Sequence, residues 1–212
     1  MKINYNHIAN EIKGLVKEYP KLPLIMGVSV SLTIAVGTVL YFRRKNRIVR
    51  YAKKFIGEEE IAGNMGFADQ EFQKMIHEYG DFNPGQQWCM SFAKMVWLKK
   101  FGLKYREQLD NLMTPSTQQT WQNFENDQSG DFKTSTEPSK GAIVIWQQFE
   151  NGTPTFKGHA GIVQDYDKEK FYTVEGNTSA VEGIDRVAEK THTYNWNLNQ
   201  GLRLKGFISI NR

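Results

Sequence analysis

The alternation of apolar and polar positions divides the chain into an N-terminal arm, a long apolar segment and a larger remainder. Residues 1–21 place apolar residues at helical spacing between polar ones, which predicts a short amphipathic arm. Residues 22–42 follow with 21 positions that carry no charge. Because a helix of about 20 apolar residues crosses a bilayer, we predict a transmembrane helix there. A buried core helix is the alternative interpretation of this segment.

A run of basic residues follows the apolar segment directly. Seven of them fall within twelve positions: Arg43, Arg44, Lys45, Arg47, Arg50, Lys53 and Lys54. We predict that residues 43–56 form a basic helix at the membrane surface, because such clusters bind anionic headgroups beside a span. Nucleic-acid binding is the competing explanation, but the rest of the chain is close to neutral, so we expect no nucleic-acid partner. The span itself contains Gly, Ser and Thr residues, which predict either packing against an assembly partner's helix or an anchor weak enough to leave the bilayer.

From residue 57 the pattern becomes that of one folded domain, which we assign to residues 57–212. Helical spacing predicts two helices, at residues 67–79 and 88–101. Residues 110–140 are polar and predict mainly loop, with one helical stretch around Trp121. Short β-type runs follow at residues 142–146, 160–163, 171–174 and 206–210. Helices before closely spaced strands predict an α+β domain with an antiparallel sheet.

The composition supports a globular domain without disulfides, metals or cofactors. Hydrophobic residues make up 40% of the chain, charged residues 24% and aromatic residues 13%, which is enough for a sizeable core. The single cysteine excludes an internal disulfide. One cysteine and four scattered histidines also lack the ligand spacing of a zinc site. Asp81 and Asn83 offer oxygens to calcium, but their spacing does not make a calcium-binding loop. We therefore predict no metal and no cofactor.

The single cysteine, Cys89, lies in the first turn of the helix predicted at residues 88–101. The free N–H groups and the helix dipole at that end favour a negative charge, and therefore the thiolate. A thiolate is the nucleophilic form of cysteine. The alternative is simple core packing, because Phe92 and Val96 share the same helical face.

His159 stands at the start of a predicted strand between Gly158 and Gly161, which allow other groups to come close. A neutral imidazole can deprotonate a thiol and later protonate a leaving amine. Glu175 and Asn177 follow the next strand, and residues two apart on a strand face the same side. Either can accept the second imidazole N–H and fix its tautomer. The alternative is that the histidine is structural and that both acceptors are ordinary turn residues.

Cysteine at a helix start, histidine on a strand and a polar acceptor on the next strand form an ordered set. This order resembles the CHAP family, the cysteine, histidine-dependent amidohydrolases/peptidases of papain-like fold. The resemblance covers about residues 47–210. Its matching pieces are Trp88-Cys89 with Phe92 and Trp97, and residues 138–146, 158–163 and 175–177. It implies a papain-like domain in which N-terminal helices pack on an antiparallel sheet.

The resemblance also implies an activity, the hydrolysis of bacterial peptidoglycan. The bond cut is either the sugar–peptide amide, as in an N-acetylmuramoyl-L-alanine amidase, or a bond within the peptide. It implies Cys89 as nucleophile, His159 as general base, and orienting roles for Glu175 and Asn177. We expect substrate contacts from neighbouring residues, namely Gln87, Trp88, Trp146 and Gly158. Such an enzyme serves wall remodelling, lysis or phage entry, and a non-catalytic binding protein of the same fold in a membrane or virion assembly is the alternative.

The charges that flank the predicted span conflict with this substrate. Seven cations follow the span and four lysines precede it, so the positive-inside rule places the C-terminal domain in the cytoplasm. Peptidoglycan requires the domain on the periplasmic or extracellular side. We predict that side for a single-pass membrane protein, with virion association as a second location. The charge asymmetry favours a third function, a cytoplasmic amide hydrolase or acyltransferase.

Overall fold

The computed structural model describes residues 45–101, 103–181 and 183–211. The chain divides into two compact units, Met1–Lys45 and Asn46–Arg212. The predicted arm at residues 1–21 and the predicted transmembrane helix at 22–42 lie outside the described residues. Within the described residues, no helix combines the length and the apolar character that crossing a membrane requires.

The basic segment opens the second compact unit. Residues 45–52 are helical, and a 3-10 turn, η1 (Lys53–Phe55), follows. Ile48 and Val49 are buried, whereas Arg47 and Arg50 are exposed. The segment is therefore an amphipathic helix whose apolar face packs into the unit, and the unit includes the segment that we treated as separate from residues 57–212.

Four further helices follow in chain order: α3 (Gln70–Gly80), α4 (Cys89–Phe101), α5 (Leu103–Leu112) and α6 (Thr117–Asn126). Side chains cap two of their starts, because Asp69 accepts from the backbone N–H of Phe72 and Ser116 from that of Gln119. The polar stretch 110–140 was predicted mainly as loop with one helical stretch around Trp121, and α6 is that helical stretch. The capping serine is the sequence signal that locates its start.

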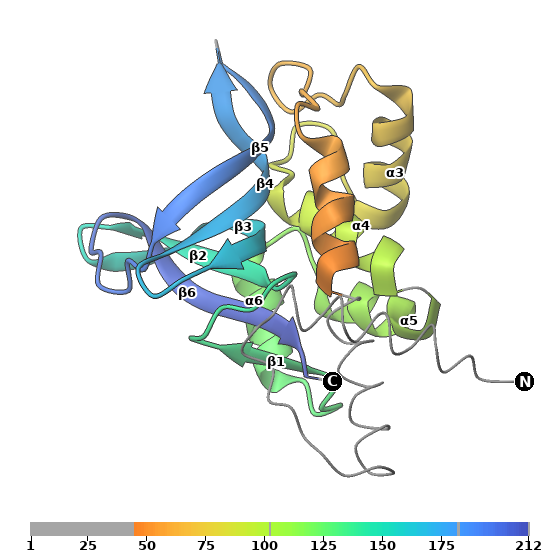
Figure 1. Cartoon of the computed structure of the whole chain (residues 1–212). Coiled ribbons are helices and arrows are strands. Elements are labelled where there is room, and N and C mark those ends of the chain that lie inside the picture. Colours follow the sequence, from red (N-terminus) through yellow and green to blue (C-terminus); the bar gives the residue numbers. More distant parts are fainter. Residues whose placement is uncertain (1–44, 102, 182, 212) are drawn as a thin grey trace, which may run out of the picture. The chain divides into compact units, whose positions relative to one another are not determined.

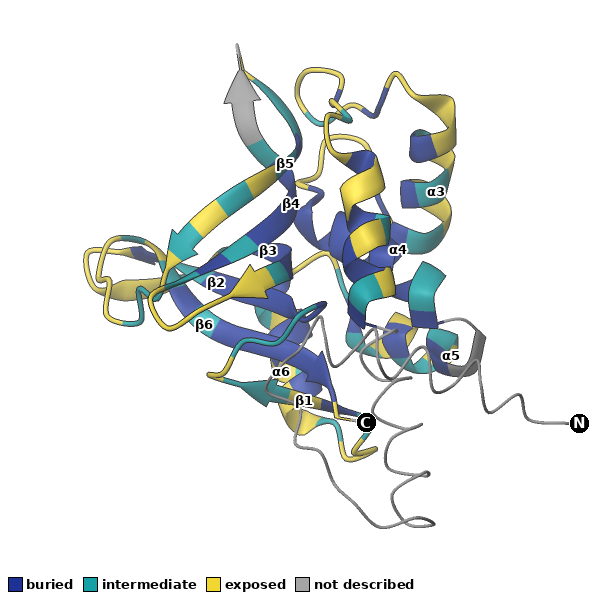
Figure 2. Cartoon of the chain, viewed as in Figure 1, coloured by how far each residue is buried: buried dark blue, intermediate teal, exposed yellow. Residues whose placement is uncertain are grey.

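Helix α4 forms the centre of the helical layer. Eleven of its 13 residues are buried, and Figure 2 shows it almost uniformly dark blue. A helix that is apolar on all sides must be enclosed by other elements. The indole of Trp97 donates to the carbonyl of Gly141 at 3.0 Å, and a side chain on Gly80 would collide with the α4 backbone at Ser91. These contacts fix the helix that carries Cys89.

A six-stranded antiparallel sheet forms the second layer, in the order β1-β6-β2-β3-β4-β5. The strands are β1 (Phe132–Ser135), β2 (Ile143–Glu150), β3 (Thr153–Tyr166), β4 (Lys170–Val181), β5 (Ile184–Thr193) and β6 (Gly201–Ile210). In Figure 1 the helices of this unit lie together on one side of the sheet. The predicted α+β architecture with an antiparallel sheet is confirmed.

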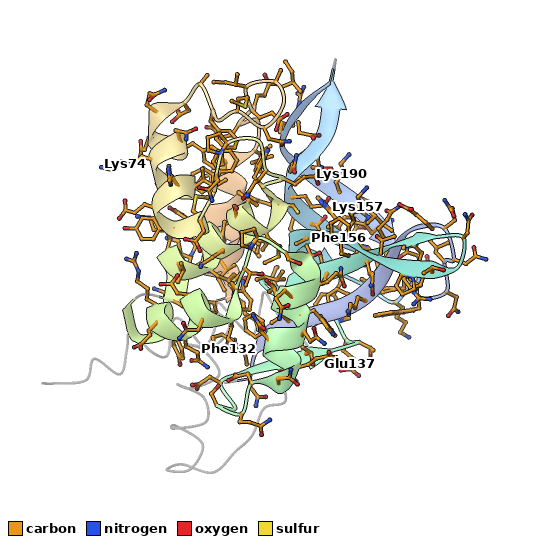
Figure 3. The ribbon with its side chains drawn as sticks, turned by 180° about the vertical axis from the view of Figure 1, so that it is seen from behind. Lys74, Phe132, Glu137, Phe156, Lys157 and Lys190 are labelled. Atoms are coloured by element: carbon orange, nitrogen blue, oxygen red, sulfur yellow. The ribbon has the colours of Figure 1, made fainter. Side chains whose placement is uncertain are left out.

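The sheet has apolar side chains on both faces of its central strands. All four residues of 143–146 in β2 are buried, although successive side chains point to opposite faces. One face carries a cluster of buried residues: Ala142, Val144, Trp146, Val163, Phe171, Leu204 and Phe207. Tyr194 and Trp196 pack against this cluster. Figure 3 shows the described side chains from behind, on the helices and on the sheet.

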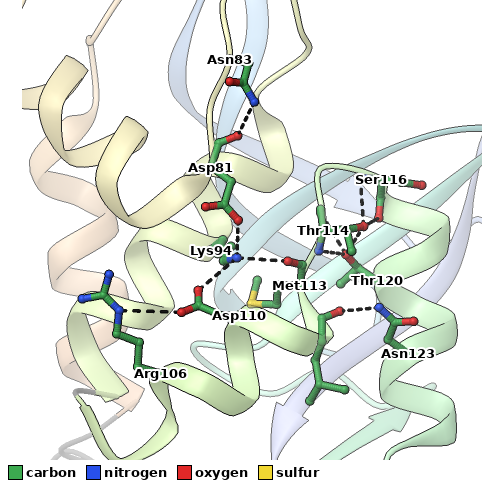
Figure 4. A network of polar contacts seen from close by, with 11 residues as sticks. Asp81, Asn83, Lys94, Arg106, Asp110, Met113, Thr114, Ser116, Thr120 and Asn123 are labelled. Atoms are coloured by element: carbon green, nitrogen blue, oxygen red, sulfur yellow. Dashed lines mark hydrogen bonds and ion pairs between the residues drawn. The ribbon is translucent and has the colours of Figure 1, made fainter.

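A buried lysine in the middle of α4 joins this helix to the end of α3 and to α5 (Figure 4). The ammonium of Lys94 in α4 lies 2.5 Å from Asp81 at the end of α3 and 3.1 Å from Asp110 in α5. It also donates to the carbonyl of Met113 at 3.2 Å. The carboxylate of Asp81, one of the two oxygen donors considered for calcium, is therefore paired with an ammonium group. The side-chain amide of Asn83 donates to the Asp81 backbone carbonyl.

Candidate active site

Cys89 is the first residue of α4 and is largely buried. Trp88, the residue before Cys89, is held by two hydrogen bonds. The backbone N–H of Trp88 donates to the side-chain oxygen of Asn177 at 3.0 Å, and its indole N–H donates to Glu60 at 2.8 Å. These bonds fix the entry into α4, and with it the position of the thiol at the helix N-terminus.

His159 and Glu175 come together from neighbouring strands. His159 lies in β3 opposite Trp146 of β2, and Glu175 lies in β4. The Nε2 atom of His159 is 2.9 Å from Oε2 of Glu175. The Glu175 side chain is 2% exposed and that of His159 is 13% exposed, so this ion pair is shielded from water.

The electrostatics of the pair depend on Cys89 as well. Burial alone lowers the pKa of His159, but the side chains of Cys89 and Glu175 outweigh it and raise this pKa from 6.5 to about 10. Burial raises the pKa of Glu175, but hydrogen bonds with His159 and His192 lower it from 4.5 to about 2. At neutral pH the pair is therefore an imidazolium and a carboxylate, and Cys89 lies within interaction range of the imidazolium.

Three glycines allow the strands and α4 to approach one another at the site. A Cβ on Gly161 would lie 2.6 Å from Cγ of Glu175, and one on Gly158 would lie 2.3 Å from the carbonyl oxygen of Trp146. A Cβ on Gly176 would lie 2.5 Å from the ring of Trp88. A side chain at Gly161 would push β3 away from Glu175, and one at Gly176 would push β4 away from the start of α4. A side chain at Gly158 would push β3 away from β2 and α6.

Asn177 has a different place from Glu175, although the two are only two residues apart. Its backbone is in the left-handed region with φ of 56°, and the pairing of β4 with β5 shifts between Glu175 and Thr178. This break ends the simple alternation that the sequence argument assumed. The Asn177 amide contacts Trp88, Asn64 and Asp185, so it supports the start of α4.

Sequence reasoning missed a second histidine at the site, His192. Its Nε2 atom lies 2.6 Å from Oε1 of Glu175. His192 belongs to β5, a strand with one buried residue, Val187, and no run of apolar residues. The only signal that places His192 here is its register, because it pairs with Phe171 in β4, and register is not readable from this polar stretch.

The residues predicted to contact substrate differ in their access to it. A pocket of about 410 Å³ lies beside the pair, and His159, Glu175, His192, Lys190 and Asn195 line it together with Trp146, Asn177, Thr178, Asp185 and Leu202. Trp88 is fully buried and its ring packs against Phe67 and Phe72. Trp146 is nearly buried and its ring packs against those of His159 and His192. Gln87 is exposed and Gly158 is half-buried.

Within the described residues, no three His, Cys, Asp or Glu side chains are grouped to hold a metal.

Part of this site falls within a region of similarity to known proteins. Residues 80–177 match the family model of the CHAP domain. This confirms the resemblance inferred from the sequence. The CHAP region includes Cys89, His159, Glu175 and Asn177, and it ends before His192.

The chain is similar to the crystal structure of a wild-type endolysin, LysIME-EF1, with 18% sequence identity and a TM-score of 0.47. The alignment covers 79% of this chain and 64% of that chain, so this chain spans less than two thirds of the endolysin's length. A search of the curated proteins found no match.

Proposed function

We propose that the protein is a cysteine-dependent peptidoglycan hydrolase, an amidase or endopeptidase. The observation that carries the proposal is the buried His159–Glu175 pair, with Cys89 beside it at a helix N-terminus. A structural core cysteine has no need of a charged imidazole next to it. The match to the CHAP domain over the same residues supports this assignment.

In the proposed reaction, the Cys89 thiolate attacks the carbonyl carbon of an amide bond, and a C–S bond forms. The backbone N–H of Cys89, free at the helix start, is suited to stabilise the negative charge that develops on the carbonyl oxygen. The His159 imidazolium then gives its proton to the departing amine nitrogen as the C–N bond breaks. The product of this step is a thioester on Cys89 and a free amine.

Water completes the reaction. His159, now neutral, removes a proton from a water molecule that attacks the thioester carbonyl. The C–S bond breaks, the carboxylic acid leaves, and the Cys89 thiolate and His159 imidazolium are restored. Glu175 remains a carboxylate throughout and keeps the Nε2 atom of His159 turned toward it. The other ring nitrogen, Nδ1, is thereby left to serve Cys89 and the substrate. Asn177 acts in this account by fixing the start of α4.

Incubation of the full chain, kept in detergent, with purified peptidoglycan tests the proposal. Mass analysis of the soluble products identifies the bond, because an amidase and an endopeptidase release different fragments. We expect Cys89→Ala and His159→Gln to release none. His77→Gln is the matched control, since His77 is exposed on α3, and it should retain wild-type activity. Equal release by wild type and Cys89→Ala, or none by either, would refute the proposal.

We further propose that residues 22–42 anchor the enzyme in a membrane and that its domain faces the wall, on the periplasmic or extracellular side or within a virion. The flanking charges favour the opposite orientation, which would suit a cytoplasmic amide hydrolase or acyltransferase. A topology reporter fused after Arg212 separates the two. A cytoplasmic signal would contradict a wall-facing domain, and a periplasmic or extracellular signal would support it.

A further inference from the structure

The Glu175 carboxylate binds two imidazoles, one on each oxygen. Its Oε2 is 2.9 Å from Nε2 of His159, and its Oε1 is 2.6 Å from Nε2 of His192. The hydroxyl of Thr173 also donates to Oε1. The mechanism described above uses only the contact with His159, so the second imidazole has no assigned role.

His192 is held rigidly in this position. Its ring stacks on Phe171 with centroids 5.4 Å apart and planes 30° apart, and it lies 4.7 Å from the ring of Trp146. Trp146 in turn contacts the His159 ring at 5.6 Å. One aromatic floor therefore supports both imidazoles, and the carboxylate lies between them.

A carboxylate held by one partner is free to turn, because the terminal torsion of glutamate has a broad energy minimum. In Glu175, a rotation that moved Oε2 away from His159 would also break the contacts of Oε1 with His192 and Thr173. We propose that His192 is a positioning residue, which fixes the plane of the Glu175 carboxylate so that Oε2 stays on His159. This inference rests on the proposed function, in which His159 serves Cys89.

The surroundings of His192 are consistent with a hydrogen-bonding role of this kind. Its side chain is 29% exposed and forms part of the pocket wall. The other charged groups of that wall are Asp185 and Lys190. Asp185 accepts from the Asn177 amide at 2.9 Å, and Lys190 lies in β5, two residues before His192. Glu175 is thus the carboxylate that the structure pairs with His192.

Two variants of His192 test this role in the full chain. His192→Gln keeps a side-chain N–H that can reach Oε1, whereas His192→Phe keeps the ring and loses the donor. With peptidoglycan fragments as substrate, we expect His192→Phe to lower kcat roughly tenfold, equal to about 1.4 kcal/mol, and to leave KM unchanged. His192→Gln should stay within about threefold of wild type. His77→Gln again serves as the control.

A second measurement separates this inference from the proposed function. The chain has four histidines, so the ring resonances of His159 in protein labelled with 15N-histidine can be assigned by their loss in His159→Gln. We expect the His159 pKa to fall toward 6.5 in His192→Phe and to stay near its wild-type value in His192→Gln. Thr173→Val, which removes the other donor to Oε1, should act in the same direction. These results need no substrate, so they stand even if wild type releases nothing from the wall.

Three outcomes would overturn the inference. The first is a wild-type kcat and an unchanged His159 titration in His192→Phe. The second is a raised KM with unchanged kcat, which would make His192 a substrate-binding residue. The third is an equal loss in His192→Gln and His192→Phe, because a lost hydrogen bond should be rescued by glutamine. If circular dichroism shows that His192→Phe does not fold, the His159 pKa in His192→Gln and in Thr173→Val decides. The inference is supported only if this pKa is unchanged in His192→Gln and lowered in Thr173→Val.

Discussion

The described part of the chain contains two clusters of charge, and they differ in which member is buried. Around Glu175 the carboxylate is buried and its partners are imidazoles. Around Lys94 the ammonium is 3% exposed, while the carboxylates of Asp81 and Asp110 are 54% and 41% exposed. An imidazole can accept and donate a proton, whereas an ammonium group can only donate hydrogen bonds. The first cluster is therefore suited to proton transfer, and the second to holding helices together.

The Glu175 cluster and the Lys94 cluster also differ in where they lie. The Glu175 cluster borders a pocket and the helix N-terminus that carries Cys89. The Lys94 cluster joins α4 to the end of α3 and to α5, and its third partner is a backbone carbonyl (Figure 4). Changes in the first cluster should affect activity much more than stability, and changes in the second should do the reverse.

The largest expected effect is on activity at Glu175. Glu175→Gln keeps the shape but removes the charge that holds His159 as an imidazolium, so peptidoglycan hydrolysis should fall by about 10²–10⁴-fold, the usual contribution of acid–base catalysis. Circular dichroism should show a folded protein. A fully active Glu175→Gln would show that the buried carboxylate is structural, as the Lys94 cluster is.

The next largest effect is expected on the free energy of unfolding, when Lys94 or its two carboxylate partners are changed. The double variant Asp81→Asn/Asp110→Asn leaves a buried ammonium without a charged partner, which typically costs about 3–5 kcal/mol. Lys94→Met removes the charge itself and should cost less, about 1–3 kcal/mol, mainly for the unpaired carbonyl of Met113. Urea unfolding measures both. A double variant as stable as wild type would show that the ammonium needs no charged partner. Both folded variants should keep the activity of wild type below their unfolding midpoints.

The smallest expected effect is the pH dependence of stability. The pKa of His159 is raised to about 10, so its pairing stabilises the fold fully below pH 6.5 and is lost as pH rises through 10. The pKa of Glu175 is lowered to about 2, so its pairing is full above pH 4.5 and is lost as pH falls through 2. The difference in unfolding free energy between wild type and His159→Gln should therefore be largest between pH 4.5 and 6.5, about 1.5–3 kcal/mol. A difference that grows above pH 6.5 would contradict the pairing.

Local sequence patterns predicted much of the fold. The predicted apolar run at residues 142–146 begins one residue before β2, and the runs at 160–163, 171–174 and 206–210 lie in β3, β4 and β6. The prediction works here because buried central strands need apolar side chains. Strand β5 was missed since its residues are mostly polar and half-exposed at the sheet edge. The N-terminal prediction at residues 22–42 lies outside the described residues.

The candidate site was predictable only where chemistry and chain order coincide. Cys89, His159 and Glu175 could be chosen because each stands beside a recognisable helix or strand. His192 could not, since its contact with Glu175 depends on the register of β4 and β5. The roles of Glu175 and Asn177 could not be separated from sequence either, because the break in β4 that turns Asn177 toward Trp88 follows from a left-handed residue.

The central claim is that His159 activates Cys89, and alkylation measures this directly. Because Cys89 is the single cysteine, the rate of its reaction with iodoacetamide in the full chain reports on one thiol. We expect rapid alkylation of wild type at pH 6, and a rate at least tenfold lower in His159→Gln that recovers only as pH rises. Equal rates in the two proteins across pH 5–9 would contradict the account.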